Sequence, residues 1–279
     1  MNRKHPETFN PGIGATTDLH LRVSVATLVR VLCENPADRE LTLAFERKAT
    51  LRQTPTGRVV SVKSQPFGGA LRIHDLRSLQ DIIGNFHFDS EESRSEQDFR
   101  IFIRHADWEA VLEFCLEHFR QLNNPVLESE PTRELKEEFV DALRSELQPD
   151  QYTFRSVGVI VEDRPSATEY IYATGYPTVR IYRVFEARIL DPSLASAMIK
   201  NSESCSNQDL RTLALENSQN GGVGRANAVL ALPFEELRRF YAAVPPEARN
   251  KPLSFQDHLL DETVTAVLDD VAAPKYRRL

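Results

Sequence analysis

The sequence predicts a mixed α/β fold in which a central mixed sheet is flanked by helices in an α/β/α layering. Segments with alternating apolar residues, typical of strands, occur over residues 41–63 and 154–190. Amphipathic segments typical of helices lie between and after them, with clear examples at 131–147 and 207–217. A chain of 279 residues with 41% hydrophobic content can bury a sizeable core. We therefore expect a protein that folds by itself, with an inserted subdomain on one side.

The N-terminal part begins with a polar stretch, residues 1–17, which predicts a flexible arm. Residues 18–34 mix helical and alternating spacing of Leu and Val. We expect a helix there, although the density of β-branched residues would equally support a strand. Residues 41–52 and 58–63 predict a hairpin, because Pro55-Thr56-Gly57 forms a turn signal between them.

Residues 74–124 are predicted to form the insertion. We expect a short helix at 76–83, a polar loop at 89–97, a strand at 99–104 and a helix at 106–122. Six residues of the last helix recur at helical spacing and are predicted to pack in the core rather than to stack on bases: Trp108, Val111, Leu112, Cys115, Phe119 and Leu122.

The second half of the chain predicts further strands and helices. The expected elements are strands at 154–162 and 169–173 joined by a turn at 163–166, a strand at 178–190, and helices near 192–199 and 207–217. Residues 18–245 would form the main domain and 246–279 a C-terminal part with a helix around 255–271 and a basic tail. That tail could dock onto the body or onto a second subunit, so a homo-oligomer is left open.

Composition excludes several functional classes. The formal net charge is −7 and no dense Lys/Arg block occurs, which argues against general nucleic-acid binding. Cys33, Cys115 and Cys205 are odd in number and widely spaced, so neither a disulfide framework nor a zinc cluster is indicated. No apolar run of about 18 residues occurs. We expect a cytoplasmic protein that does not enter a membrane.

The helix predicted at 131–147 concentrates acidic side chains. Glu134, Glu137 and Glu138 fall within about 100° of one another on the helix, and the opposite side carries an apolar stripe. We therefore expect the acidic face to point away from the packing. Arg133 offsets only part of the repulsion between these carboxylates, and a divalent cation would balance the rest. Hard oxygen ligands suit Mg²⁺ or Mn²⁺. The alternative is an ordinary solvated acidic face.

The run Arg133-Glu134-Leu135-x-Glu137-Glu138 resembles the second half of the Nudix box, the signature of hydrolases that cleave nucleoside diphosphates linked to another moiety. Upstream, Pro66-Phe67-Gly68-Gly69 is similar to the Pro-Gly-Gly segment that precedes the box, and residues 231–237 are similar to the strand and closing helix of that fold. The box is split here by the predicted insertion. Val140 and Pro125 stand where the family has a glycine and a glutamate.

The resemblance implies a Nudix-like sandwich and a Mg²⁺- or Mn²⁺-dependent hydrolase that cleaves a pyrophosphate linkage in a nucleotide-type small molecule. It implies metal binding by Glu134, Glu137 and Glu138, with Arg133 orienting Glu137 and one of these Glu residues as a candidate base. Gly68 and Gly69 would contact the substrate. A later residue, Glu169, Glu186 or Glu203, could add a ligand or base. The alternatives are a catalytically inactive Nudix-like module that senses a nucleotide and a protein-interaction scaffold.

Overall fold

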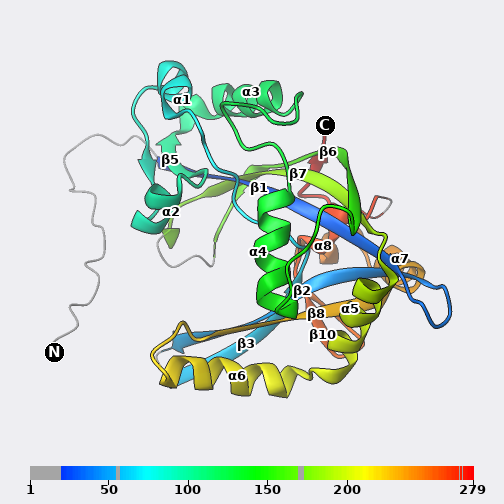
Figure 1. Cartoon of the computed structure of the whole chain (residues 1–279). Coiled ribbons are helices and arrows are strands. Elements are labelled where there is room, and N and C mark those ends of the chain that lie inside the picture. The colour runs from blue at the N-terminus through cyan, green and yellow to red at the C-terminus, as the bar shows by residue number, and fades with distance from the viewer. Residues whose placement is uncertain (1–19, 55–56, 169–172, 270, 272) are drawn as a thin grey trace. The chain divides into compact units, whose positions relative to one another are not determined.

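The structure is a computed structural model and describes residues 20–54, 57–168, 173–269, 271 and 273–279 (Figure 1). The predicted N-terminal arm, 1–17, lies outside the described residues. The chain divides into two compact units. Unit 1 contains described residues 20–26 together with 70–130 and 161–181, and unit 2 contains 27–69, 131–160 and 182–279. Strands β1, β6 and β7 contribute residues to both units.

Unit 1 combines short strands with helices. Its first strand segment, His20–Ser24 of β1, pairs antiparallel with β5, and β5 pairs with β4. The elements with residues in unit 1 are β1 (His20–Glu34), α1 (Leu76–Ile83), β4 (His87–Phe88), α2 (Glu91–Glu96), β5 (Arg100–Arg104), the 3-10 helix η1 (His105–Asp107), α3 (Trp108–His118), β6 (Tyr152–Ser166) and β7 (Thr178–Ile189).

Several predictions for this unit are confirmed. The helix at 76–83 and the strand ending at Arg104 are present. Five of the six predicted core residues are buried: Trp108, Val111, Leu112, Cys115 and Phe119. Leu122 was predicted to be buried as well but is 50% exposed, because α3 ends at His118 and does not reach it.

Two other predictions are wrong in unit 1. The predicted loop at 89–97 contains α2, whose N-terminus is capped by the Ser90 side chain accepting from the Ser93 N–H. The predicted turn at 163–166 is strand, because β6 continues to Ser166 and Arg180 of β7 donates to both Glu162 and Ser166 of β6. The predicted strand at 169–173 falls mostly outside the described residues.

Unit 2 is built on a mixed sheet. Strands follow the order β11-β6-β7-β1-β2-β3-β10-β9, and β8 pairs with β2. The predicted hairpin is confirmed by the antiparallel pairing of β2 and β3, whereas β10 runs parallel to β3. The strands that belong wholly to unit 2 are β2 (Leu41–Thr54), β3 (Gly57–Gln65), β8 (Arg225–Pro233), β9 (Leu253–Phe255), β10 (His258–Leu260) and β11 (Arg277–Arg278).

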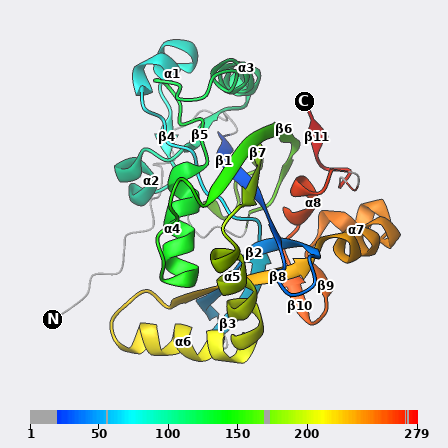
Figure 2. The same ribbon diagram turned by 45° about the vertical axis from the view of Figure 1, so that its right-hand side comes forward.

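Helices lie on both faces of the β2–β8 part of this sheet (Figures 1 and 2). The helices of unit 2 are α4 (Thr132–Leu143), α5 (Pro192–Ser204), α6 (Asn207–Gln219), α7 (Phe234–Ala243), the 3-10 helix η3 (Pro246–Asn250) and the short α8 (Val264–Val267). Successive side chains of a strand point to opposite faces. Ala44 and Val229 pack in the cluster that includes α4 and α5, whereas Ala49 and Ala228 pack with α6.

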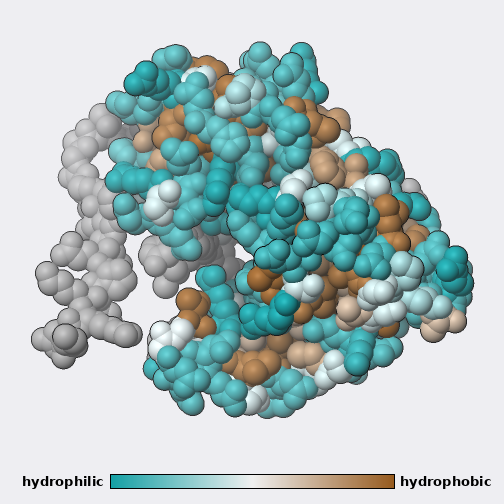
Figure 3. All heavy atoms as spheres, viewed as in Figure 1, coloured by the Kyte–Doolittle hydropathy of each residue, from teal (hydrophilic) through white to brown (hydrophobic). Residues whose placement is uncertain are grey.

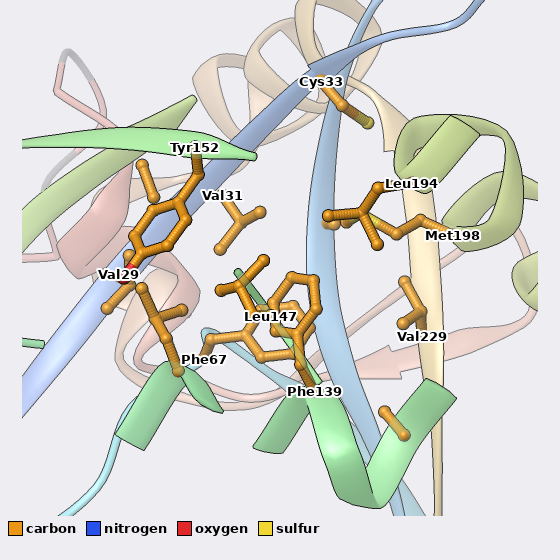
Figure 4. Packing of buried hydrophobic residues seen from close by; sticks show 14 of the residues in the cluster. Val29, Val31, Cys33, Phe67, Phe139, Leu147, Tyr152, Leu194, Met198 and Val229 are labelled. Atoms are coloured by element: carbon orange, nitrogen blue, oxygen red, sulfur yellow. The ribbon is translucent and has the colours of Figure 1, made fainter. Parts of the chain in front are cut away.

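The main core of unit 2 joins α4 and α5 to the sheet (Figure 4). Leu135, Phe139 and Ala142 of α4 are buried in it, as the apolar stripe predicted. Phe139 lies against Phe67, with ring centroids 5.1 Å apart. On the other face, the outer surface of α6 mixes hydrophilic and hydrophobic residues (Figure 3), and Leu213 and Leu215 remain partly exposed. The packing of α4 therefore fixes which of its side chains point toward the sheet.

Two predicted helices are strands or turns instead. Residues 20–34 form β1, in which both faces are buried over most of the length, so the β-branched residues decided the outcome. The predicted helix around 255–271 is replaced by the β9–β10 hairpin and α8. Gln256 and Asp257 have φ values of 47° and 61°, the left-handed conformation of a two-residue hairpin turn.

The structure confirms the predicted mixed α/β class. The expected helices near 192–199 and 207–217 are present as α5 and α6, and the strand and helix expected around 231–237 are β8 and α7. Among the described helices, none has the length and apolar character needed to cross a membrane.

Candidate functional site

The Gly68-Gly69 turn follows β3 and is held by the backbone of β1. The Val29 N–H donates to the Phe67 carbonyl at 2.7 Å, and the Thr27 N–H donates to the Gly69 carbonyl at 2.9 Å. Gly68 has a φ of +130°, and a Cβ there would lie 2.2 Å from the Thr27 carbonyl oxygen. Only glycine fits at this position.

Helix α4 brings two carboxylates to this turn. Leu135 and Phe139 are buried, and each is the next residue after a glutamate, Glu134 or Glu138. Residues four apart lie one above the other on a helix, so Glu134 and Glu138 form a pair along its length. The packing of Leu135 and Phe139 thereby sets the direction of both carboxylates.

The turn and the helix meet closely. The Gly68 backbone N–H donates to Glu138 Oε2 at 2.5 Å. A Cβ on Gly69 would lie 2.1 Å from Glu134 Oε2, so the absence of a side chain at Gly69 makes room for that carboxylate. Four of the residues singled out from the sequence, Gly68, Gly69, Glu134 and Glu138, therefore lie together in unit 2.

The acidic face does not point away from the packing as predicted. Glu138 is only 8% exposed, whereas the side chain of Glu137 is 56% exposed. Glu138 lies next to Phe139 on the helix, and it turns inward toward the glycine turn. Among the described residues, no group of three or more His, Cys, Asp or Glu side chains is arranged so that it could hold a metal ion. The predicted trio is thus divided into an inward pair and an outward Glu137.

Arg133 forms ion pairs both with Glu134 of the inward pair and with the outward Glu137. Its guanidinium lies 2.5 Å from Glu134 Oε1 and 3.2 Å from Glu137 Oε2. The pairing with Glu137 is the one that the resemblance implied, and the pairing with Glu134 is additional. The Arg133 and Glu134 side chains are only 21% and 12% exposed, so this ion pair is partly desolvated, whereas the ion pair with Glu137 is open to solvent.

Glu46 of β2 is a further residue of this site, and sequence reasoning missed it. It is completely buried and accepts from Lys48 Nζ at 3.0 Å, Gln65 Nε2 at 3.0 Å and Asn227 Nδ2 at 2.9 Å. Glu46 lies on the same face of β2 as Ala44, which is the face covered by α4. The sequence carried no local signal for it, because the other residues on its face of β2 are mostly polar: Thr42, Ala44, Lys48 and Thr50.

The environment of Glu138 strongly disfavours its charged form. Burial raises the pKa of Glu138 well above its ordinary value of 4.5, and the neighbouring Glu46 and Glu134 carboxylates raise it further. Lys48 and the Gly68 N–H act in the opposite direction. Glu46 and Glu138 are both buried, and Lys48 and the Gly68 N–H offset their mutual repulsion only in part. Binding of a proton or a cation beside Glu138 would therefore be favourable.

A surface pocket adjoins the outer side of α4. It has a volume of about 480 Å³, and its lining consists of Lys136, Glu137, Val140, Asp141, Glu146, Leu147 and Gln148. Glu137 thus faces a space open to small molecules. Val140, at the position where the Nudix box has glycine, is one of the walls of this pocket.

Glu186 and Glu203, two of the later glutamates considered as additional ligands, do not join this site. Glu186 lies in a separate network, where it accepts from Arg30 at 2.7 Å and from Arg155 at 3.1 Å. Glu203 is exposed near the end of α5, and Glu169 lies outside the described residues. Comparison with known proteins matched no family model, no curated protein and no solved structure.

Proposed function

We propose that this chain is a metal-dependent hydrolase of the Nudix type, which cleaves a pyrophosphate linkage in a nucleoside diphosphate derivative. The observation that supports it is the contact of the Gly68-Gly69 turn with Glu134 and Glu138. The resemblance implied a glycine turn and an Arg-Glu-x-x-Glu-Glu helix at one site. The turn and the helix are far apart in sequence but meet in the fold. In addition, helices on both faces of the sheet agree with the proposed Nudix-like sandwich.

The residues present suit a Mg²⁺ or Mn²⁺ ion. Glu134 and Glu138 would hold it from the inner side of α4, whereas Glu137, which points outward, would act from the side of the pocket. A Mg²⁺ site commonly uses one or two protein carboxylates, with waters and substrate phosphates completing the shell, so a cluster of three protein ligands is not required. When bound, the ion would neutralise charge on the phosphates and lower the pKa of a bound water.

The protein's own groups have distinct roles in this proposal. Gly68 and Gly69 let the turn lie against the Thr27 backbone and the Glu134 carboxylate, and in this proposal the turn would contact the substrate beside that carboxylate. Arg133 positions Glu134 and Glu137 through its two ion pairs. Glu137 is the most accessible of the three carboxylates and lines the pocket, so it is suited to accept a proton from the attacking water.

The second candidate is a catalytically inactive module that binds a nucleotide and reports on it. It is favoured by the division of the acidic trio, which leaves no metal-holding group of three among the described side chains. Val140 in the pocket wall and Pro125 in place of the box glutamate also favour it.

Calorimetry with Mn²⁺, followed by assay of monophosphate release from a panel of nucleoside diphosphate derivatives, tests the proposal. We expect Mn²⁺ binding and turnover, with both reduced at least tenfold in Glu138→Gln. Glu216→Gln, an exposed change on α6, is the matched control and is expected to behave as wild type. Mn²⁺ binding without turnover would favour the inactive module. Absence of a Mn²⁺ signal would refute the metal-dependent hydrolase.

A further inference from the structure

Arg47 is a buried cation that forms no ion pair with a described residue, and the Asp209 carboxylate only partly offsets the lowering of its pKa by burial. It is 1% exposed, and its Nη2 donates to the Cys205 carbonyl. Its Nε has no hydrogen-bond partner in the described chain, and no described carboxylate lies within ion-pair distance. An uncompensated buried charge is strongly destabilising, so most buried arginines are paired with an acid. Glu46, the preceding residue, points to the opposite face of β2 and cannot supply the charge.

The sheet register places His258 on the same face as Arg47. Arg47 pairs with Ser64 of β3, and Ser64 pairs with Leu260 of β10. His258 precedes Leu260 by two residues and therefore shares its face. His258 Nδ1 is buried and has no partner among the described residues. The pKa of His258 is lowered, first by burial and then by Arg47, whereas Asp257 acts in the opposite direction.

The N-terminus of α6 lies over the same face. Ser206 caps this helix of 13 residues, and Cys205, whose carbonyl binds Arg47, directly precedes the cap. Asn207, the first helical residue, donates through Nδ2 to the Asp257 carbonyl at 3.3 Å, and its Oδ1 is buried without a described partner. Three polar atoms from β2, β10 and α6 are therefore unsatisfied in one region.

We propose that Arg47, His258 and the N-terminal turn of α6 bind a phosphate group at a site separate from the carboxylates of α4. A guanidinium and a helix N-terminus both favour an anion, and they match the geometry of phosphate oxygens. The Asn207 Oδ1 can accept the proton of a monohydrogen phosphate. A cation would be repelled by Arg47, and an apolar ligand would leave the buried polar atoms unsatisfied.

The nearby acidic group does not occupy this role. Asp209 accepts from the Ser206 N–H at 2.8 Å and from its hydroxyl at 2.7 Å, which completes the capping box of α6. Asp209 is exposed. Ser206 and the β9–β10 turn at Gln256 and Asp257 are also exposed, so the proposed site lies beneath a solvent-exposed edge formed by α6 and this hairpin turn.

Thermal unfolding of the full chain in increasing inorganic phosphate tests the site. Sodium chloride keeps the ionic strength constant, and a chelator removes divalent cations so that the α4 carboxylates do not contribute. Above the dissociation constant, we expect the unfolding midpoint to rise by about 2–3 °C for each tenfold increase in phosphate. Arg47→Met should unfold at the same or a higher temperature without phosphate and should lose the response. Arg211→Met, an exposed change on α6, should keep it.

The outcomes decide the proposal. A wild-type midpoint that does not respond to phosphate, or an undiminished response in Arg47→Met, would overturn it. If Arg47→Met does not fold, Arg47→Lys replaces it, since lysine keeps the charge but loses the Nε donor and the planar fork. We expect about tenfold weaker phosphate binding in that variant, and unchanged binding would also overturn the proposal. A parallel titration with adenosine monophosphate distinguishes free phosphate from a phosphomonoester as the better ligand.

Discussion

The backbone N–H of Gly68 donates to the carboxylate of Glu138 at 2.5 Å, although 70 residues separate the two along the chain. The contact joins the turn after β3 to the middle of α4. Because Gly68 also lies against the Thr27 carbonyl of β1, the position of Glu138 is tied to the sheet as well as to the helix. This arrangement makes the turn and the helix a single structural site whose parts can be tested separately.

Gly69→Ala tests the fit between the turn and Glu134. The added methyl group would lie 2.1 Å from Glu134 Oε2, so the carboxylate must move. We expect Mn²⁺ affinity and hydrolysis to fall by tenfold or more, since a displacement of about 1 Å in a catalytic group can reduce the rate a hundredfold. Calorimetry and the monophosphate assay measure the two effects.

The control for this variant is Gly84→Ala. Gly84 has a φ of +72°, but no atom lies within 4 Å of the added Cβ. The control therefore introduces backbone strain of about 1 kcal/mol without any contact with the site. If Gly84→Ala reduced Mn²⁺ affinity as much as Gly69→Ala, loss of stability rather than displacement of Glu134 would explain both.

Glu138→Gln should change the pH dependence of stability. The pKa of Glu138 is raised in the folded protein, mainly by burial and then by Glu46. Between the ordinary value of 4.5 and the raised value, the folded state retains a proton that the unfolded state has lost. Stability of the wild type therefore falls as the pH rises through this window, by up to about 1.4 kcal/mol per pH unit. Gln cannot ionise and avoids this loss.

Urea unfolding at several pH values from 4 to 8 measures the effect. We expect the two proteins to differ least at pH 4 and the variant to gain relative to wild type as the pH rises. A constant difference across this range would mean that Glu138 is ionised in the folded protein and that its environment compensates the charge.

The elements with long, regular patterns could be predicted from sequence. Leu135, Phe139 and Ala142 recur at helical spacing, and they are buried on one side of α4. The strand β7 and the hairpin of β2 and β3 follow from alternation and a turn signal. The spacing of Leu and Val in residues 20–34 fitted helix and strand alike, and these residues form a strand that pairs with β2 and β5.

The candidate site could be predicted only in part. The sequence indicated that Glu134, Glu137 and Glu138 share a helix face, but the orientation of that face depends on tertiary packing against Phe67. Glu138 is buried because the glycine turn reaches it, and this contact involves residues that local patterns do not connect. Glu46 was missed for the same reason, since its three hydrogen bonds come from β2, β3 and β8.

Phe139→Ala tests whether packing of α4 controls the direction of the carboxylates. Phe139 is 1% exposed, and we expect the truncation to lower the free energy of unfolding by about 3–5 kcal/mol. Val140→Ala, on the exposed side of the same helix, should change it by less than about 0.5 kcal/mol. Denaturant unfolding measures both, and similar values for the two variants would contradict the assigned packing of α4.

Arg133→Lys tests whether Arg133 positions Glu134 and Glu137. Lysine retains the charge but cannot hold two carboxylates through a planar fork. We expect turnover to fall by about 10- to 100-fold, as for other residues that orient metal ligands, with a stability change of less than about 1 kcal/mol. The Mn²⁺ titration adds a readout independent of turnover. Full activity in Arg133→Lys would show that charge alone is sufficient.

Glu46→Gln examines the residue that the sequence did not reveal. Glu46 accepts from Lys48, Gln65 and Asn227, and an amide NH₂ in place of one oxygen would face donors. We expect a loss of about 1–3 kcal/mol in the free energy of unfolding. The same change removes a neighbouring negative charge and should lower the pKa of Glu138, so the fall in stability with rising pH should become weaker. Urea unfolding at pH 5 and pH 8 measures both effects, with the exposed change Glu40→Gln as control. A variant as stable as wild type at both pH values would show that Glu46 is neither held by these donors nor coupled to Glu138.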